Sequence, residues 1–297
     1  MDEAARTALD DLPPLREVIA RFGLGARKSL GQHFLLDLNL TRRIARAAGD
    51  LTAATVIEVG PGPGGLTRAL LAEGAARVVA IERDRRCVEA LQDLVAASGG
   101  RLSLLEADAT EVDAASLGPP PRHIVANLPY NIATALLVDW LRKAEAFAGM
   151  TLMFQKEVAE RIAAPPGSKT YGRLSVMAGW RCDVRILFNL PARAFTPPPK
   201  VASSVIQLRP LPAPRYPATW DALEAVTAAA FGQRRKMLRG ALRTLRVDTE
   251  RLLGAAGIDP EARAEMLSVE AFAALARAYA ALTRSPDGAE RNPGLVP

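Results

Sequence analysis

Four consecutive residues, Asn127, Leu128, Pro129 and Tyr130, follow directly on an apolar run at 123–126. Pro129 has no backbone N–H and favours an extended conformation at Leu128, so the chain is stiff where it leaves a predicted strand. The Asn127 side chain can accept and donate hydrogen bonds, and the Tyr130 ring offers a flat apolar face. Together these groups could hold a planar ring that carries an exocyclic amine. An ordinary strand-to-loop turn is the alternative interpretation, because Asn and Pro are common in turns.

A glycine-rich loop follows the first predicted strand. Gly60, Gly62 and Gly65 match the GxGxxG pattern between a strand at 56–59 and a helix. Glu82, at the end of the next strand, could accept hydrogen bonds from the hydroxyl pair of a ribose. The pattern suits a nicotinamide cofactor and S-adenosylmethionine equally well, and a purely structural glycine turn is a third interpretation.

Two further features favour S-adenosylmethionine. Pro61 and Pro63 stiffen the loop, which disfavours wrapping around a pyrophosphate. Asp108 and Ala109 follow the third predicted strand, where the Asp108 carboxylate could accept from an adenine amine. A helix cap is the competing role for Asp108.

With such a donor, the Asn127 segment predicts methylation of an adenine amine. This amine is a poor nucleophile because its lone pair is delocalised into the ring. The Asn127 side-chain oxygen and the Leu128 carbonyl could hold both N–H bonds and turn the lone pair toward the methyl sulfonium. Stacking on Tyr130, with Phe195 on the other face, would hold the extruded base.

The elements that must position these residues alternate between strand and helix. The predicted strands span 56–59, 77–82, 102–106, 123–127 and 150–154, and the predicted helices span 66–73, 84–97 and 133–146. This alternation predicts a parallel sheet covered on both faces, which binds its ligand beyond the carboxyl ends of the strands. Gly60, Glu82, Asp108 and Asn127 each lie at one of four such ends.

The chain is expected to form two domains. Two further predicted strands at 184–188 and 201–208 complete a first domain over 1–210, and a proline-rich linker follows. A second, all-α domain is expected over 218–284, with a flexible tail at 285–297. Its predicted helices span 220–231, 234–245, 250–256 and 269–282.

A basic stretch within the predicted helix at 234–245 is the candidate surface for a polyanion. Between Arg234 and Arg246 there are six basic residues and no acidic one. Like charges at i, i+4 repel on a helix, so phosphates opposite them would explain the pattern, and a solvated helix face is the alternative. The RNA-binding candidates are Arg234, Arg235, Lys236, Arg239 and Arg243.

Composition limits the remaining possibilities. The 297 residues are 49% hydrophobic and 24% charged, with a net charge of +6, which is typical of a globular protein and favours a polyanionic partner. Cys87 and Cys182 are the only cysteines, and their spacing does not support a zinc site. Sparse cysteine and the absence of a long apolar run lead us to expect a cytoplasmic protein.

Several motifs, taken in order, resemble the ribosomal RNA adenine N6,N6-dimethyltransferases that act on the small subunit. The resemblance extends from about residue 26 to residue 282. It rests on Ser29–Leu35 (SLGQHFL), Glu58–Gly62 (EVGPG), Asn127–Asn131 (NLPYN), Phe154–Arg161 (FQKEVAER), Phe195–Val205 (FTPPPKVASSV) and Gln233–Lys236 (QRRK).

The resemblance implies a fold, a cofactor and a substrate. The fold would be a Rossmann-like methyltransferase domain, with a mainly parallel seven-stranded sheet and an antiparallel last strand, followed by a small helical domain. The substrate would be two adjacent adenosines in a hairpin loop near the 3′ end of 16S rRNA, dimethylated during small-subunit assembly by a protein expected to be monomeric. The implied S-adenosylmethionine contacts are Gln32, His33, Leu35, Gly60, Gly62, Glu82, Asp108, Ala109 and Asn127.

One departure and three alternatives accompany this interpretation. His33 occupies a position where the family usually has Asn, and an imidazole can also donate or accept. A methyltransferase of large-subunit rRNA is the nearest alternative, and the 154–161 and 233–236 motifs argue against it. A non-catalytic assembly or transcription factor of the same fold is the second alternative. A nicotinamide dehydrogenase is the third, and it leaves the Asn127 segment unexplained.

Overall fold

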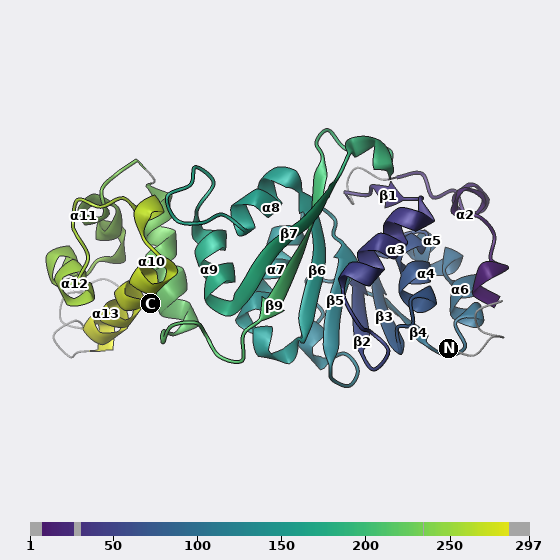
Figure 1. Ribbon diagram of the computed structural model, residues 1–297, viewed down its shortest axis with the longest axis horizontal. Helices are drawn as coiled ribbons and strands as arrows, with labels where there is room; N and C mark the ends of the chain where they lie inside the picture. Colours follow the sequence, from purple (N-terminus) through teal and green to yellow (C-terminus); the bar gives the residue numbers. More distant parts are fainter. Residues whose placement is uncertain (1–7, 27–30, 234, 285–297) are drawn as a thin grey trace, which may run out of the picture. The chain divides into compact units, whose positions relative to one another are not determined.

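The computed structural model describes residues 8–26, 31–233 and 235–284 (Figure 1). The described chain divides into two compact units. The first comprises residues up to Ala159 together with Asp183–Pro210, and the second comprises Glu160–Cys182 and the residues from Leu211 onward. The expected tail at 285–297 and two residues of the first motif, Ser29 and Leu30, lie outside the described residues.

The first unit is built on a seven-stranded sheet in the order β4-β3-β2-β5-β6-β9-β7 (Figure 1). The strands are β2 (Thr55–Val59), β3 (Arg77–Glu82), β4 (Leu102–Glu106), β5 (Arg122–Asn127), β6 (Gly149–Gln155), β7 (Cys182–Leu190) and β9 (Ser203–Pro210). Strands β2 to β6 pair in parallel, and β9 pairs antiparallel with β6. The predicted, mainly parallel sheet with an antiparallel last strand is therefore confirmed.

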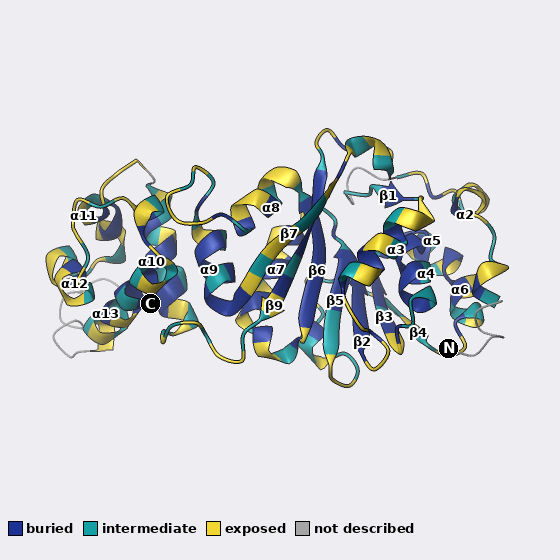
Figure 2. Ribbon diagram, viewed as in Figure 1, coloured by how far each residue is buried: buried dark blue, intermediate teal, exposed yellow. Residues whose placement is uncertain are grey.

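Short apolar runs bounded by turn residues explain why these strands form. Every residue of β2 is buried, and the centre of β5, Ile124–Ala126, is buried as well (Figure 2). Strands that are covered on both faces carry near-continuous apolar runs. The chain moves from β2 to β3 in one direction along the sheet and from β5 to β6 in the other. Right-handed crossovers therefore place α4 (Gly65–Ala72), which follows β2, and α7 (Ala133–Arg142), which follows β5, on opposite faces of the sheet.

The helices that cross between these strands match the predicted ranges only in part. The predicted helix at 84–97 is two helices, α5 (Arg85–Ala90) and α6 (Gln92–Ala97), that meet at Leu91. The others are α4 (Gly65–Ala72) and α7 (Ala133–Arg142), the latter followed by a 3-10 turn at Ala144–Ala146. The carboxyl ends of β2 and β5, where the strand order reverses, are the usual ligand position in such a sheet.

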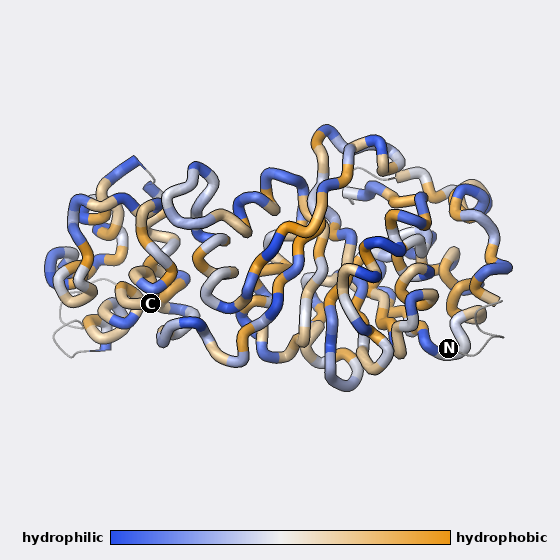
Figure 3. Tube along the Cα trace, in the orientation of Figure 1, coloured by the Kyte–Doolittle hydropathy of each residue, from blue (hydrophilic) through white to orange (hydrophobic). Residues whose placement is uncertain are grey.

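The N-terminal segment lies at this end of the sheet. It contains α2 (Leu15–Arg21), the two-residue strand β1 (Phe34–Leu35) and α3 (Leu38–Ala47), which Asp37 caps by accepting from the Asn39 backbone N–H. Strand β1 pairs antiparallel with β8 (Phe195–Thr196) in a separate two-stranded sheet. Helix α3 carries a strongly hydrophilic outer face, visible as a blue stretch in Figure 3.

The second unit is helical. It contains α9 (Arg173–Arg181), α10 (Trp220–Gly232), α11 (Leu238–Ala241), α12 (Thr249–Ala256) and α13 (Val269–Arg284), and α8 (Lys156–Ile162) enters it from the first unit. The predicted helix over 234–245 is wrong. Within the described part of that range, α11 is a single turn that is followed by a 3-10 turn at Leu242–Leu245. Met237 instead forms an antiparallel bridge with Arg263 and has an extended backbone conformation.

The segment 160–182 packs with the helices, whereas the expected boundary assigned it to the sheet domain. The Trp180 indole N–H donates to the Tyr216 carbonyl (2.7 Å), and the Trp180 ring lies 6.2 Å from that of Trp220. These contacts bury the apolar face of α9 against α10. In the described part of the chain, no helix combines the length and the apolar character needed to cross a membrane.

Candidate functional site

A pocket opens at the carboxyl ends of the central strands, and all the residues that line it belong to the first unit. It lies beside the point where the strand order reverses between β2 and β5. Its wall includes the four predicted strand-end residues and most of the predicted contacts around them. These lining residues are Gln32, His33, Leu35, Gly60, Gly62, Glu82, Asp108, Ala109, Asn127, Leu128, Pro129 and Tyr130.

The glycine loop packs directly against residues 31–35, which we call the N-terminal wall. Gly62 has a φ of +56°, and a Cβ placed there would lie 2.9 Å from the Phe34 ring. A Cβ on Gly65 would lie 2.6 Å from the backbone oxygen of Leu35, a distance that no real contact allows. Glycine is required at both positions because the wall approaches the loop so closely.

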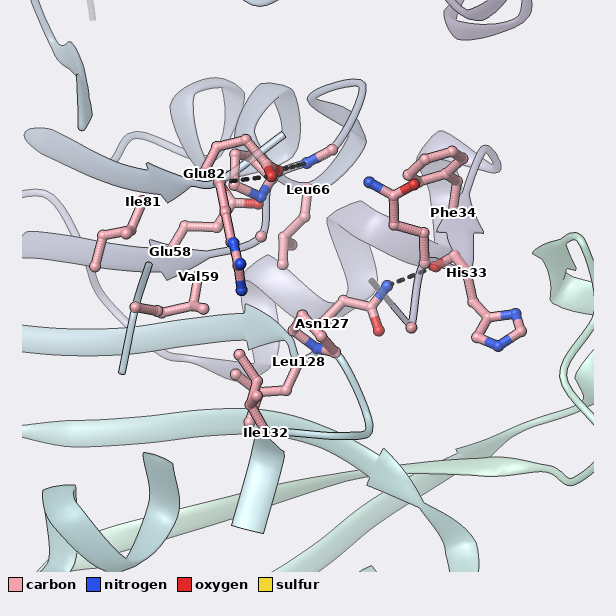
Figure 4. A pocket seen from close by; sticks show the side chains of 18 of the residues that line it. His33, Phe34, Glu58, Val59, Leu66, Ile81, Glu82, Asn127, Leu128 and Ile132 are labelled. Atoms are coloured by element: carbon pink, nitrogen blue, oxygen red, sulfur yellow. Dashed lines mark hydrogen bonds between the residues drawn. The ribbon is translucent and has the colours of Figure 1, made fainter. Parts of the chain in front are cut away.

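The Glu82 carboxylate is held by backbone donors. One oxygen, Oε2, accepts from the Gly62 N–H (3.1 Å), and the other, Oε1, accepts from the N–H groups of Arg83 and Asp84 (both 2.8 Å) (Figure 4). Burial raises the pKa of Glu82, although all three backbone N–H groups favour the ionised form. The carboxylate is thus fixed at the end of β3 with acceptor positions toward the pocket.

Glu58 is a second carboxyl group on the wall of the pocket, one residue before the end of β2. It is 1% exposed, and its Oε2 has no hydrogen-bond partner among the described residues. Burial raises the pKa of Glu58 to about 8, and the neighbouring Glu82 adds to the effect. Glu58 is therefore largely protonated near neutral pH in the free protein.

The Asp108 carboxylate forms a local turn. Its Oδ1 accepts from the backbone N–H (3.0 Å) and the hydroxyl (2.7 Å) of Thr110, and its Oδ2 pairs with Arg83 (2.8 Å). The hydrogen bonds from Thr110, followed by the charge of Arg83, hold the pKa of Asp108 below its usual value. The competing structural role for Asp108 is therefore present, as a cap on a turn, while its side chain still lines the pocket.

The Asn127 amide has a fixed orientation. Its Nδ2 donates to the carbonyl oxygen of His33 at 3.0 Å (Figure 4). This bond fixes the plane of the amide, so the Oδ1 of Asn127 points away from the His33 carbonyl and can act as an acceptor. The N-terminal wall thus fixes the amide at the end of β5 so that its oxygen is available as an acceptor.

The Tyr130 ring is held by two contacts. Its hydroxyl lies 2.6 Å from the Oγ of Ser203 on β9, and its ring centroid lies 5.5 Å from that of His33, with 30° between the planes. Burial raises the pKa of the Tyr130 hydroxyl. The phenol is therefore neutral at physiological pH and keeps a defined orientation.

The His33 side chain turns away from the pocket, although its backbone contributes to the wall (Figure 4). Its Nδ1 lies 2.8 Å from the carbonyl oxygen of Pro197, and it must carry the proton because a carbonyl only accepts. The imidazole therefore connects the wall, the Tyr130 ring and the loop after β8. The His33 side chain is therefore placed to support the Tyr130 ring rather than to contact a cofactor in the pocket.

The predicted stacking of Phe195 on a base requires an exposed ring, but the ring is buried. Phe195 is 2% exposed and belongs to a hydrophobic cluster with Leu35, Ile44 and Val205. Pairing of β8 with β1 turns this side chain into the core beneath the N-terminal wall. The proposed stacking of Phe195 on a base therefore has no ring face available in this structure.

The predicted basic stripe does not form one helical face. Arg235 and Lys236 precede α11, Arg239 lies within it and pairs with Glu261 (3.6 Å), and Arg243 follows in the 3-10 turn. Arg234 lies outside the described residues. In the ranges that the structure describes, no group of three or more His, Cys, Asp or Glu side chains could hold a metal ion.

Several lining residues escaped the sequence analysis. Arg83 pairs with Asp108 across the mouth of the pocket, and Phe34, Leu66 and Ile132 supply apolar surface. Arg83 directly follows the strand-end Glu82, a position that could have indicated it. The apolar residues gave no signal because their types are equally common in a core.

Comparison with known proteins places these features in a family. A family model described as ribosomal RNA adenine dimethylase matches residues 23–281. A protein of Rhodospirillum rubrum named ribosomal RNA small subunit methyltransferase A is 62% identical over 278 residues, which cover 94% of this chain and 96% of that protein. A protein of the same name from Paramagnetospirillum magneticum is 64% identical over 273 residues, or 92% and 97% of the two chains.

Solved structures show the same similarity. The crystal structure of a dimethyladenosine transferase from Plasmodium falciparum superposes with a TM-score of 0.71 at 26% identity, covering 82% of this chain and 96% of that one. The structure of the 23S rRNA methyltransferase ErmE superposes with a TM-score of 0.63 at 25% identity, covering 83% and 99%.

Proposed function

This chain belongs to the ribosomal RNA adenine dimethylase family, and from that premise we propose that it methylates two adjacent adenosines near the 3′ end of 16S rRNA. The methyl groups come from S-adenosylmethionine, and each adenosine becomes N6,N6-dimethyladenosine during assembly of the small subunit. The observation that carries this proposal is the Asn127 amide. Its donor is committed to the His33 carbonyl, which leaves an acceptor at the mouth of the pocket.

The residues of the pocket fit the methyl donor. Gly62 and Gly65 let the glycine loop and the N-terminal wall pack closely along one side of the pocket, and Glu82 presents a fixed carboxylate suited to a ribose hydroxyl pair. The unpartnered Oε2 of Glu58 is a buried polar atom on the same wall. Gln32, His33, Leu35, Gly60, Asp108, Ala109 and Asn127 complete the proposed contacts, the His33 contact being through its backbone.

When bound, S-adenosylmethionine supplies an electrophilic methyl group on a sulfonium sulfur. The Asn127 Oδ1 and the Leu128 carbonyl oxygen accept hydrogen bonds from the two N–H groups of the adenine amine. These hydrogen bonds raise electron density on the nitrogen and direct its lone pair toward the pocket. Pro129 keeps the carbonyl of Leu128 and the amide of Asn127 in a stiff turn. Catalysis by this arrangement needs orientation rather than a strong base.

The Tyr130 ring holds the extruded base. One side of the ring faces His33, so the base stacks on the opposite side. Stacking of a base on an aromatic side chain contributes about 1–3 kcal/mol. Ser203 fixes the angle of the Tyr130 ring through its hydroxyl and thereby fixes the plane of the base.

The helical second unit binds the ribosomal RNA in this proposal. Arg235, Lys236 and Arg243 are basic residues around α11, and with Arg234 and Arg239 they form the proposed phosphate-binding set. Each phosphate contact releases counterions, so binding weakens as salt increases. We place the enzyme in the cytoplasm as a monomer, where its substrate particle assembles.

A large-subunit substrate is the second candidate, since one structural neighbour is named a 23S rRNA methyltransferase. The relatives at 62% and 64% identity carry the small-subunit name and favour the first candidate. Both are tested by incubating the protein with labelled methyl donor and undermethylated small subunits, large subunits or naked rRNA. We expect dimethyladenosine only on small-subunit RNA. Product on large-subunit RNA, or none on small-subunit RNA, would refute the proposal.

A further inference from the structure

The N-terminal wall of the pocket has little regular structure to hold it. Its only strand, β1, is two residues long and pairs with the equally short β8. The wall nevertheless contacts the glycine loop at Phe34 and Leu35 and orients the Asn127 amide through the His33 carbonyl. Some further contact must therefore hold it against the sheet.

An ion pair between the buried Asp84 and the partly exposed Arg86 supplies that contact. The Asp84 carboxylate accepts from Gln32 Nε2 (3.0 Å) and from Arg86 through Nη2 (2.6 Å) and Nε (3.0 Å). The Arg86 guanidinium also donates to the carbonyl oxygens of Gly23 (2.8 Å) and Gly25 (3.5 Å). One ion pair thus joins the chain after α2 and the start of the wall to the end of β3.

The position of this pair makes it strong. Asp84 is 4% exposed, and the Arg86 side chain is largely covered. The Arg86 hydrogen bonds, with a smaller contribution from Gln32, lower the pKa of Asp84 to about 2. Removing Arg86 would leave the buried charge of Asp84 uncompensated, which is destabilising.

The same turn carries the proposed ribose acceptor. The Asp84 backbone N–H donates to Glu82 Oε1, and the Asp84 side chain begins α5 by accepting from the Arg86 N–H (3.2 Å). Neither Asp84 nor Arg86 lines the pocket. Any effect of the pair on a ligand must therefore pass through Gln32, the N-terminal wall and Glu82.

We propose that Asp84 and Arg86 are positioning residues that fasten the N-terminal wall to the Glu82 turn and so preorganise the methyl-donor pocket. This inference rests on the proposed function for the identity of the ligand. A preorganised wall binds the donor without the cost of ordering the segment on binding. Loss of the pair loosens the wall and thereby weakens donor binding.

The test compares two neighbouring arginines. Arg86→Met removes the pair, whereas Arg85→Met is the matched control because Arg85 is 79% exposed and pairs only at the surface with Glu89 (3.3 Å). The dissociation constant of S-adenosylhomocysteine is measured by calorimetry on the protein alone. Hydrogen exchange of the Phe34 and Leu35 amides is measured without ligand.

We expect Arg86→Met to raise the dissociation constant about tenfold, which corresponds to about 1.4 kcal/mol, and to speed exchange of the wall amides. Arg86→Lys should restore part of the affinity because a lysine keeps the charge but loses the bidentate geometry. Arg85→Met should match the wild type in both measurements. Equal dissociation constants or equal exchange in the two Met variants would overturn the inference.

A second substitution, at Gln32, tests the same contact if the Arg86→Met variant does not fold. Gln32→Met removes the bond from the wall to Asp84 and leaves the Asp84–Arg86 pair in place, and its wall amides should still exchange faster. Unchanged exchange in Gln32→Met would overturn the inference. Neither measurement uses RNA. A wild-type protein that binds S-adenosylhomocysteine but does not methylate small subunits would therefore refute the proposed function and leave the inference about Asp84 and Arg86 standing.

Discussion

The buried carboxyl group of Glu58 makes the stability of this protein depend on pH in a direction opposite to that of most carboxylates. Burial raises the pKa of Glu58 from 4.5 to about 8. The folded state therefore holds a proton that the unfolded state releases between these two values. Stability contributed by the protonated group is fully present below pH 4.5 and is lost as the pH rises toward 8.

The size of the effect follows from the two pKa values. They differ by about 3.5, and each pKa unit corresponds to about 1.4 kcal/mol, so the full change is roughly 5 kcal/mol. Between pH 5.5 and pH 7.5, inside the window, the loss is roughly 2–3 kcal/mol. Glu58→Gln keeps the shape of the side chain without a titrating proton and should abolish this part of the pH dependence.

The assay is urea unfolding of the wild type and of Glu58→Gln, followed by circular dichroism at pH 5.5, 6.5 and 7.5. Other groups with shifted pKa values titrate in both proteins, including Glu82, raised by burial, and His123, lowered by burial. The difference in unfolding free energy between the two proteins therefore reports the titration of Glu58 together with its coupling to Glu82. Relative to the variant, the wild type should lose stability from pH 5.5 to 7.5, and a constant difference would refute a protonated Glu58.

Three substitutions test other parts of the site. Gly65→Ala places a Cβ 2.6 Å from a backbone oxygen of the N-terminal wall and should weaken S-adenosylhomocysteine binding more than tenfold, as measured by calorimetry. Gly254→Ala in α12 is the control, because its Cβ meets no neighbour and should stabilise the protein by up to about 1 kcal/mol. Equal affinity in the two variants would contradict the close approach of the wall at Gly65. Phe195→Leu should lower the unfolding free energy by about 1 kcal/mol and leave kcat unchanged, and a large fall in RNA affinity without loss of stability would restore a stacking role. Ser203→Ala leaves the Tyr130 hydroxyl without its partner and should reduce methyl transfer several-fold, but it should have no further effect in a Tyr130→Phe background, as a double-mutant cycle would measure.

The sheet and the main features of the pocket could be predicted from the sequence. The bounds of the strands at 77–82 and 102–106 match those of β3 and β4, because apolar runs there are bounded by polar and turn residues. Once a parallel sheet is assumed, its topology brings the strand ends together. Glu82 and Asn127 could therefore be assigned to one pocket without knowledge of any side-chain contact.

The remaining features depend on contacts that leave no local pattern. Asp84 and Arg86 look like an ordinary helix start, and their partners lie 52 to 63 residues away in the chain. Phe195 sits in a proline-rich loop that suggests exposure, but pairing of β8 with β1 buries it. The predicted helix at 234–245 is interrupted because Met237 pairs with a residue from a later turn. Tertiary contacts override local propensity in each case.

The central claim, that Asn127 orients an adenine amine for methylation, is tested most directly by single-turnover methyl transfer. Undermethylated small subunits are mixed with labelled S-adenosylmethionine and either wild type or Asn127→Ala, and dimethyladenosine is quantified by mass spectrometry. We predict that wild type forms dimethyladenosine and that Asn127→Ala slows transfer by about 100-fold or more while S-adenosylhomocysteine affinity changes only a few-fold. Transfer by Asn127→Ala at the wild-type rate would contradict the claim.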